Sequence, residues 1–221
     1  MLPWILFTAV ALAGLLVAER RGSRQGIYVC KPLASLGFLG AAVAAGALGS
    51  PYGRAILAAL ALSWIGDVLL MSSRSAVFLA GLGAFLLAHV GFGAAFCLRG
   101  EAWPWTAGAL ALLILPAVIV SRWLRPHLPP EMRVPVHAYI AVITGMLALA
   151  VGTAAAGSPA LLLAGALAFY LSDLSVANDR FVRPGFLNRL WGLPLYYAAQ
   201  LCLAASVRWL DRISALGIGR R

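Results

Sequence analysis

The sequence is poor in charged residues, and acidic residues are the scarcest of them. Asp and Glu together number 7 in 221 residues, and all charged residues make up 11% of the chain. A soluble domain usually carries about twice that charged fraction. Because 62% of the residues are hydrophobic, a soluble fold of this length could not bury so much apolar surface. The composition excludes an ordinary soluble domain and predicts an integral membrane protein.

Lysine is nearly absent, since Lys31 is the one residue among 17 basic residues that is not Arg. The basic residues stand mostly in short spacers between apolar runs and form no stripe with aromatic residues, so we expect no nucleic-acid partner. Their excess in alternate spacers favours termini outside the cytoplasm. An Arg bias is typical of a GC-rich genome, so we expect a multi-pass protein of a bacterial inner (plasma) membrane.

Cysteine is scarce as well. Cys30, Cys97 and Cys202 are far apart, odd in number and outside any CxxC pair. Such cysteines predict neither a disulfide framework nor a zinc site. We expect no metal and no cofactor.

The sequence does contain a series of apolar runs of about 20 residues, the length that crosses a bilayer. The first is followed by Glu19 and Arg20 instead of a small-residue cleavage site, which predicts a retained span and not a signal peptide. We therefore predict one all-α domain over residues 1–221, a polytopic membrane bundle of about eight transmembrane helices. The predicted spans are 3–18, 32–49, 52–72, 76–98, 103–121, 134–156, 159–178 and 186–209.

Two acidic residues, Asp67 and Asp173, lie inside these spans. An aspartate at mid-span costs about 2.5–3.5 kcal/mol on insertion scales, so each must meet water, a partner or a proton. Each could simply cap or bridge helices as a buried hydrogen-bonding group. Acids within membrane spans are nevertheless functional by default.

The two carboxyl groups are expected at one depth. Their spans run in the same direction, and each Asp is five residues from the end of its span, about 7 Å of helix rise. Lys31 is expected to open the second span on that same side. Three ionisable groups on three helices therefore predict a site.

Further polar residues are candidates for lining the same space. Tyr196, Tyr197 and Gln200 can share one face of the eighth span. For each candidate, ordinary interhelical hydrogen bonding or interface anchoring remains an open interpretation. The other candidates are His89 in the fourth span, Tyr139 about one turn into the sixth and Asn178 at the end of the seventh.

A short motif recurs in the two halves of the chain. An aromatic residue, an apolar residue, a small residue and Asp occur at 64–67 and again at 170–173. The two spans are four apart, as a tandem four-helix repeat would give.

These segments resemble the YhhN family of membrane proteins, which includes the lysoplasmalogenases. The resemblance implies eight spans and hydrolysis of the vinyl ether bond of lysoplasmalogens, which releases a fatty aldehyde and a glycerophospho-alcohol. The implied partners are a lysophospholipid substrate and the lipid bilayer, and no oligomeric state follows. The matching segments are Lys31 to Leu33, Gly66 to Leu70, Phe85 to His89, Tyr139, Ser172-Asp173 with Asn178, and Tyr197 to Gln200.

Vinyl ether hydrolysis begins with protonation of the outer vinyl carbon, and water then attacks the oxocarbenium ion. The reaction needs one protonated carboxylic acid and one carboxylate, roles that two buried neighbouring acids can divide. Glycosidases meet a similar problem with two carboxyl groups. Asp67 and Asp173 are therefore the expected catalytic pair, without a choice of which is the acid. Lys31 and His89 are expected to hold the phosphate or to favour ionisation of one carboxyl group.

Two other functions remain open. Paired intramembrane acids also form proton relays, so a proton-coupled transporter is the main alternative. A metal-dependent membrane hydrolase could use Asp67, His89 and Asp173, although zinc usually prefers more His or Cys ligands.

Overall fold

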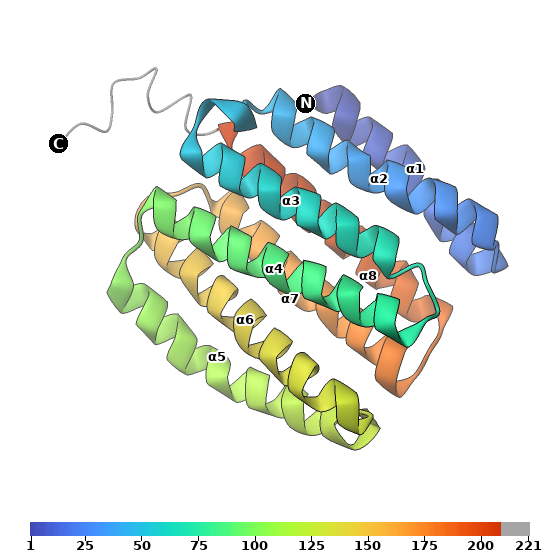
Figure 1. The fold of residues 1–221 in the computed structure, drawn as a ribbon. Helices are drawn as coiled ribbons and strands as arrows, with labels where there is room; N and C mark the ends of the chain where they lie inside the picture. The colour runs from blue at the N-terminus through green and yellow to red at the C-terminus, as the bar shows by residue number, and fades with distance from the viewer. Residues whose placement is uncertain (209–221) are drawn as a thin grey trace.

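The computed structural model describes residues 1–208 as a bundle of helices (Figure 1). Within that range there are eight α-helices and no strands, which confirms the predicted all-α fold. The last predicted span residue, 209, and the tail residues Arg212, Arg220 and Arg221 lie outside the described residues. The helices are α1 (Leu2–Arg21), α2 (Arg24–Ala44), α3 (Pro51–Leu69), α4 (Ser75–Arg99), α5 (Trp103–Leu124), α6 (Pro130–Ala155), α7 (Ala160–Ala177) and α8 (Phe186–Ser206).

Seven of these helices, α1 to α7, are long and apolar enough to cross a membrane. Large apolar side chains are exposed along their outer faces, as on α5, where Leu112 is 78% and Leu115 is 66% exposed. Such faces are suited to lipid, where apolar exposure carries no penalty. α8 is more polar because it carries Asn188, Arg189 and Gln200, yet it packs lengthwise on α7. The protein is a multi-pass membrane bundle.

Two helices begin earlier than predicted, and this changes the place of two candidate residues. α2 starts at Arg24, where the Ser23 side chain accepts a hydrogen bond from the Gly26 amide and caps the helix. Lys31 therefore lies seven residues inside α2, so the prediction that it opens the span is wrong. α6 starts at Pro130, and Tyr139 lies more than two turns into it instead of one. Both helices begin with a polar first turn, so their first residues do not belong to the apolar runs from which the spans were predicted.

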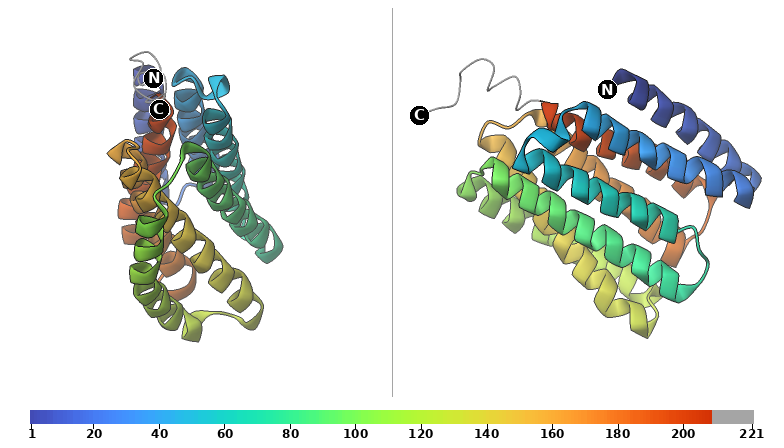
Figure 2. Two further views of the ribbon diagram at one scale, coloured as in Figure 1. Left: turned by 90° about the vertical axis from the view of Figure 1, so that its left-hand side faces the viewer. Right: turned by 45° about the horizontal axis from the view of Figure 1, so that its top comes forward.

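The helices pair as sequential neighbours and then close into one bundle (Figures 1 and 2). α2 packs on α3 as α6 packs on α7, and α4 contacts α6 as α8 contacts α2. The halves differ at their first helices. α1 packs on α2 and also contacts α8, whereas α5 packs mainly on α6. This arrangement is what a tandem four-helix repeat would give. The repeat itself stays a prediction.

The N-terminus and the end of α8 lie at one end of the bundle (Figure 1). α3 and α7 both run from that end to the other, where the α3–α4 and α7–α8 connections lie. Asp67 is in the last turn of α3, and Asp173 is close to the end of α7. The fold therefore carries both acids to the same end of the bundle.

Candidate active site

A cavity of about 360 Å³ lies within the bundle, and both Asp67 and Asp173 line it. Its volume is at the lower end of the range of about 300–1,000 Å³ that is typical of small-molecule sites. Lys31, Tyr139 and Tyr196 also line it. The remaining wall is mainly apolar and includes Leu70, Phe78, Phe85, Leu124, Val136 and Ile143.

Asp67 is held by three donors. Lys31 Nζ lies 3.3 Å from Asp67 Oδ1. The hydroxyl groups of Ser35 on α2 and Tyr196 on α8 each donate to Asp67 Oδ2 over 2.7 Å. Asp67 is only 3% exposed, and a buried carboxyl group with a cation and two hydroxyl donors is arranged for the ionised state.

Tyr197 supports the Asp67 cluster from behind. Its hydroxyl oxygen lies 3.2 Å from Ser35 Oγ, and it also donates to the Lys31 carbonyl over 3.3 Å. Its side chain is 1% exposed, and it is absent from the cavity wall formed by residues 1–208. Tyr197 thus positions Ser35 and the α2 backbone.

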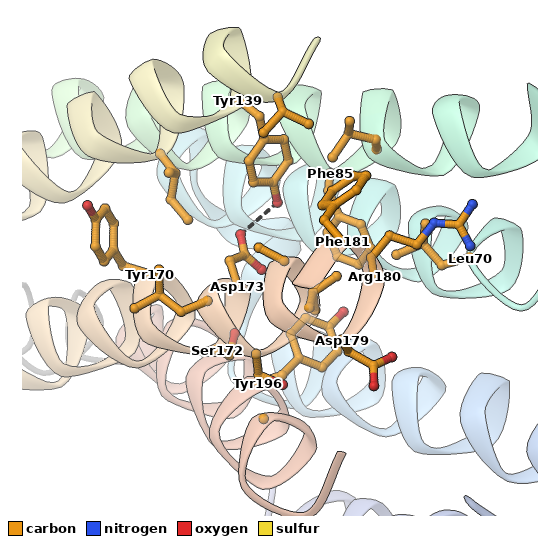
Figure 3. Close-up of a pocket in the computed structure, with 18 of the residues that line it drawn as sticks. Leu70, Phe85, Tyr139, Tyr170, Ser172, Asp173, Asp179, Arg180, Phe181 and Tyr196 are labelled. Atoms are coloured by element: carbon orange, nitrogen blue, oxygen red, sulfur yellow. Dashed lines mark hydrogen bonds between the residues drawn. The ribbon is translucent and has the colours of Figure 1, made fainter. Parts of the chain in front are cut away.

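Asp173 has a different set of partners. Tyr139 Oη donates to Asp173 Oδ2 over 2.7 Å, and the two side chains point toward each other (Figure 3). His89 Nε2 lies 3.7 Å from the same carboxyl oxygen. No Lys or Arg in the described part of the chain pairs with Asp173.

The His89 ring lies behind Asp173. Its Nδ1 lies 2.6 Å from the Phe85 carbonyl oxygen, which can only accept, so Nδ1 carries a proton. Nε2 makes no hydrogen bond within residues 1–208 and is fully buried. His89 Nε2, the ring nitrogen without a proton, therefore faces the Asp173 carboxyl group.

The two carboxyl clusters correspond between the halves of the bundle. Asp67 on α3 is contacted from α2 and α8, and Asp173 on α7 is contacted from α6 and α4. A shift of four helices converts one set into the other. Each acid is therefore held by one helix of its own half and one of the other half.

Aromatic packing sets the distance between these helices. The Phe85 ring packs edge-on against Tyr196 with centroids 5.9 Å apart and against Phe169 at 6.2 Å. A Cβ added at Gly66 would lie 2.6 Å from the Phe85 ring. The glycine that precedes Asp67 therefore allows α3 to approach α4 closely, which brings Asp67 to the cavity wall.

A charged group lines the cavity where α7 ends and α8 begins. Asp179, Arg180 and Arg189 all belong to its wall. Arg189 Nη2 donates to Asp179 Oδ2 over 2.6 Å. Asp179 Oδ1 accepts from the Gly185 amide over 3.0 Å, and Asn178 donates to Asn188 over 2.8 Å. These contacts order η3 (Asn178–Val182), a short π-helix that follows α7 and carries Arg180.

The structure brings together Lys31, Tyr139 and the two acids, as the sequence predicts. His89 and Tyr197 contact that group from behind and do not line the cavity formed by residues 1–208. Asn178 lies in the η3 network, away from the acids. Gln200 is fully buried, outside that wall, and its amide atoms find no hydrogen-bond partner in the described residues. Substrate binding by these residues stays a prediction.

Three residues of this site are not among the candidates from the sequence. Ser35 is one turn after Lys31, and that i, i+4 spacing could have identified it. Tyr196 is one of the candidates and does line the cavity, but its hydrogen bond to Asp67 did not follow from the sequence. Arg180 and Arg189 resemble ordinary spacer residues in the sequence, and only the turn between α7 and α8 brings them to the cavity.

The bundle and its cavity define a polytopic membrane protein with two carboxyl groups at one internal site. The chain belongs to the YhhN family, whose model matches residues 26–207. The resemblance seen in the sequence is confirmed.

The curated relatives of this chain include proteins named lysoplasmalogenase from animals and bacteria. The lysoplasmalogenase TMEM86B of Sus scrofa is 34% identical over 202 residues, 91% of this chain and 83% of the relative. The lysoplasmalogenase TMEM86B of Homo sapiens is 34% identical over 206 residues, 92% and 84% of the two chains. A lysoplasmalogenase of Mycobacterium bovis is 34% identical over 176 residues, which cover 74% of this chain and 65% of the relative. No solved structure matches the chain.

Proposed function

We propose that this chain is a lysoplasmalogenase of a bacterial plasma membrane. It hydrolyses the vinyl ether bond of a lysoplasmalogen and releases a fatty aldehyde and a glycerophospho-alcohol. The observation that carries the proposal is that Asp67 and Asp173, from two parallel helices, line one cavity. The names of relatives that match most of the chain give the reaction.

The reaction needs a proton donor and a carboxylate on either side of one carbon–carbon double bond. A proton is added to the outer vinyl carbon, and the positive charge spreads over the inner carbon and the ether oxygen. Water then adds to the inner carbon and loses a proton, and the resulting hemiacetal collapses to aldehyde and alcohol. In the collapse the protonated base gives its proton to the leaving alcohol oxygen, and the hemiacetal hydroxyl gives its proton to the deprotonated acid. The net change consumes one water and returns the acid and the base to their starting states.

Asp67 is the carboxylate in this proposal. Lys31 and two hydroxyl groups donate to it, and such a set of donors favours the ionised form. The negative charge stabilises the oxocarbenium ion, as a carboxylate does in glycosidases. Asp67 also accepts the proton of the attacking water.

Asp173 is the proton donor. It has one strong hydrogen-bond donor, Tyr139, and no cation from Lys or Arg among the described residues, so a protonated carboxyl group is accommodated here far better than at Asp67. His89 Nε2 lies 3.7 Å from the carboxyl group and can accept a hydrogen bond that orients the protonated Asp173. His89 acts through Asp173 and does not touch the substrate.

The cavity wall suits a single-chain lipid. Apolar residues of α4, α5 and α6 surround the space beside the acids, including Phe78, Leu124 and Ile143. An alkenyl chain placed there removes apolar surface from water, which contributes about 0.8 kcal/mol per buried CH₂ group. We propose that the lipid enters from the bilayer with its vinyl ether between Asp67 and Asp173.

A panel of lysolipids tests the proposal with the purified protein in detergent. A 1-alkenyl lysophospholipid should release aldehyde, while the 1-alkyl ether and the 1-acyl ester of the same headgroup should release no products. The alkyl ether cannot form the oxocarbenium ion by protonation of carbon, so it is the matched control. Absence of aldehyde from every vinyl ether, together with proton-coupled flux in proteoliposomes, would contradict the proposal in favour of a transporter.

A further inference from the structure

The geometry points to a binding site for the phosphate diester of a lysophospholipid headgroup, formed by Arg180 with Arg189 at the η3 end of the cavity. This inference rests on the proposed function, because it names the part of the protein that recognises the headgroup of that substrate. Both arginines line the same cavity as the two acids.

Lys31 is not available for that task. Its ammonium group lies 3.3 Å from Asp67 Oδ1 inside the bundle. His89 is fully buried and outside the cavity wall formed by residues 1–208. Lys31 and His89 are therefore poorly placed to hold the phosphate. The cationic residues of the cavity wall near η3 are the better candidates.

Arg180 is held in place while its charge remains uncompensated. Its guanidinium carbon lies 4.1 Å from the centroid of the Phe78 ring, and Phe78 in turn packs edge-on against Phe181 at 6.2 Å. Within residues 1–208 Arg180 forms no ion pair. A planar guanidinium stacked on an aromatic ring keeps its edge free for a phosphate, which it can bind through two parallel hydrogen bonds.

Arg189 provides a second donor in the wall of the same cavity. Its pairing with Asp179 over 2.6 Å uses Nη2, which leaves other N–H groups of the five on the guanidinium. Asp179 cancels much of that charge, so Arg189 contributes hydrogen bonds and direction, and Arg180 contributes net charge.

The spacing agrees with the shape of a lysophospholipid. Arg180 follows Asp173 by seven residues, about 10 Å of helix rise. The three carbons of glycerol separate the ether oxygen from the phosphate ester oxygen. A lipid with its vinyl ether beside Asp173 therefore brings its phosphate toward η3, within reach of a long Arg side chain.

Binding of uncleavable ligands tests the inference without relying on turnover. The probes are 1-O-alkyl-glycerophosphoethanolamine and 1-O-alkylglycerol, which differ in the phosphate headgroup, measured by titration of the purified protein. Arg180→Gln should weaken the phospholipid about threefold to fivefold, as expected for loss of a charge pair at an exposed site that solvent screens, and leave alkylglycerol binding unchanged. Arg183→Gln, an exposed arginine of the same connection that does not line the cavity, should alter neither.

Three results would overturn the assignment. One is an equal loss, or no loss, for both ligands in Arg180→Gln. Another is an equal effect of Arg183→Gln. The last is competition by inorganic phosphate as strong as that by the phospholipid, which would identify a site for free phosphate instead. Failure of vinyl ether cleavage would remove the proposed function and leave this binding result standing.

Discussion

Lys31 Nζ lies 3.3 Å from Asp67 Oδ1, and the two side chains are 9% and 4% exposed. A buried ion pair of this kind is a poor source of net stability, but removal of one partner leaves a charge without compensation. Each member of the pair therefore depends on the other inside the bundle.

Lys31→Met should destabilise the protein by about 3–5 kcal/mol, the usual cost of breaking a buried pair. Thermal unfolding in detergent measures this. Lys31→Met with Asp67→Asn should recover most of the lost stability and remain inactive. Arg24→Met, an exposed cation at the start of the same helix, should change stability by less than about 0.5 kcal/mol. Equal stability of the single and double variants would contradict the pairing.

His89→Phe should lower kcat about 10- to 100-fold and leave KM unchanged, because His89 positions Asp173 from behind the cavity wall. Phe keeps the ring that packs against Phe169 at a centroid distance of 4.4 Å and removes Nε2. Steady-state kinetics on a vinyl ether lysolipid separates the two constants. His137→Phe, on a half-buried His of α6 away from the cavity wall, is the control. A rise in KM alone would assign His89 to substrate binding.

Much of this site was predictable from the sequence, because hydropathy and helix rise are local properties. The lengths of the apolar runs predicted the bundle, and the equal distance of Asp67 and Asp173 from their span ends predicted a shared depth. The sequence between α7 and α8 did not reveal Arg180 and Arg189 as cavity residues. Their place depends on a network that joins Asp179, Asn188 and Gly185 across a connection.

The partners of each acid could not be predicted in the same way. The rotation of a helix about its axis depends on packing against its neighbours, such as the approach of Gly66 to Phe85. Hydropathy carries little of that information, because lipid and protein interior are both apolar. The sequence therefore identified the acids and left open that Lys31 pairs with one and Tyr139 with the other.

Gly66→Ala should destabilise the bundle by about 1–3 kcal/mol, since its Cβ would lie 2.6 Å from the Phe85 ring. Displacement of Phe85 should also lower activity, because this ring packs against Tyr196, a donor to Asp67. Gly83→Ala, on α4, meets no atom within 4 Å and should be neutral or slightly stabilising in a helix. Unfolding temperatures of the two variants check the contrast. Equal unfolding temperatures would show that the α3–α4 approach is not tight.

Hydrolysis in D₂O should place one deuterium on carbon 2 of the released aldehyde, because the mechanism protonates the outer vinyl carbon. Immediate reduction of the aldehyde with borohydride prevents exchange through the enol, and mass spectrometry of the alcohol locates the label. The reaction should also slow in D₂O when proton transfer to carbon limits the rate. Cleavage that leaves carbon 2 free of deuterium would exclude carbon protonation as the first step.

The rate of aldehyde release by Asp67→Asn and Asp173→Asn, compared with the unaltered protein on a 1-alkenyl lysophospholipid, tests the central claim most directly. Each substitution keeps the side-chain shape and removes the acid or the charge, so each should lower the rate by at least about 10²-fold. Glu131→Gln, the same chemical change at an exposed position in the first turn of α6, should retain the full rate. Retained activity in either Asp variant, with folding intact by thermal unfolding, would contradict catalysis by the Asp67–Asp173 pair.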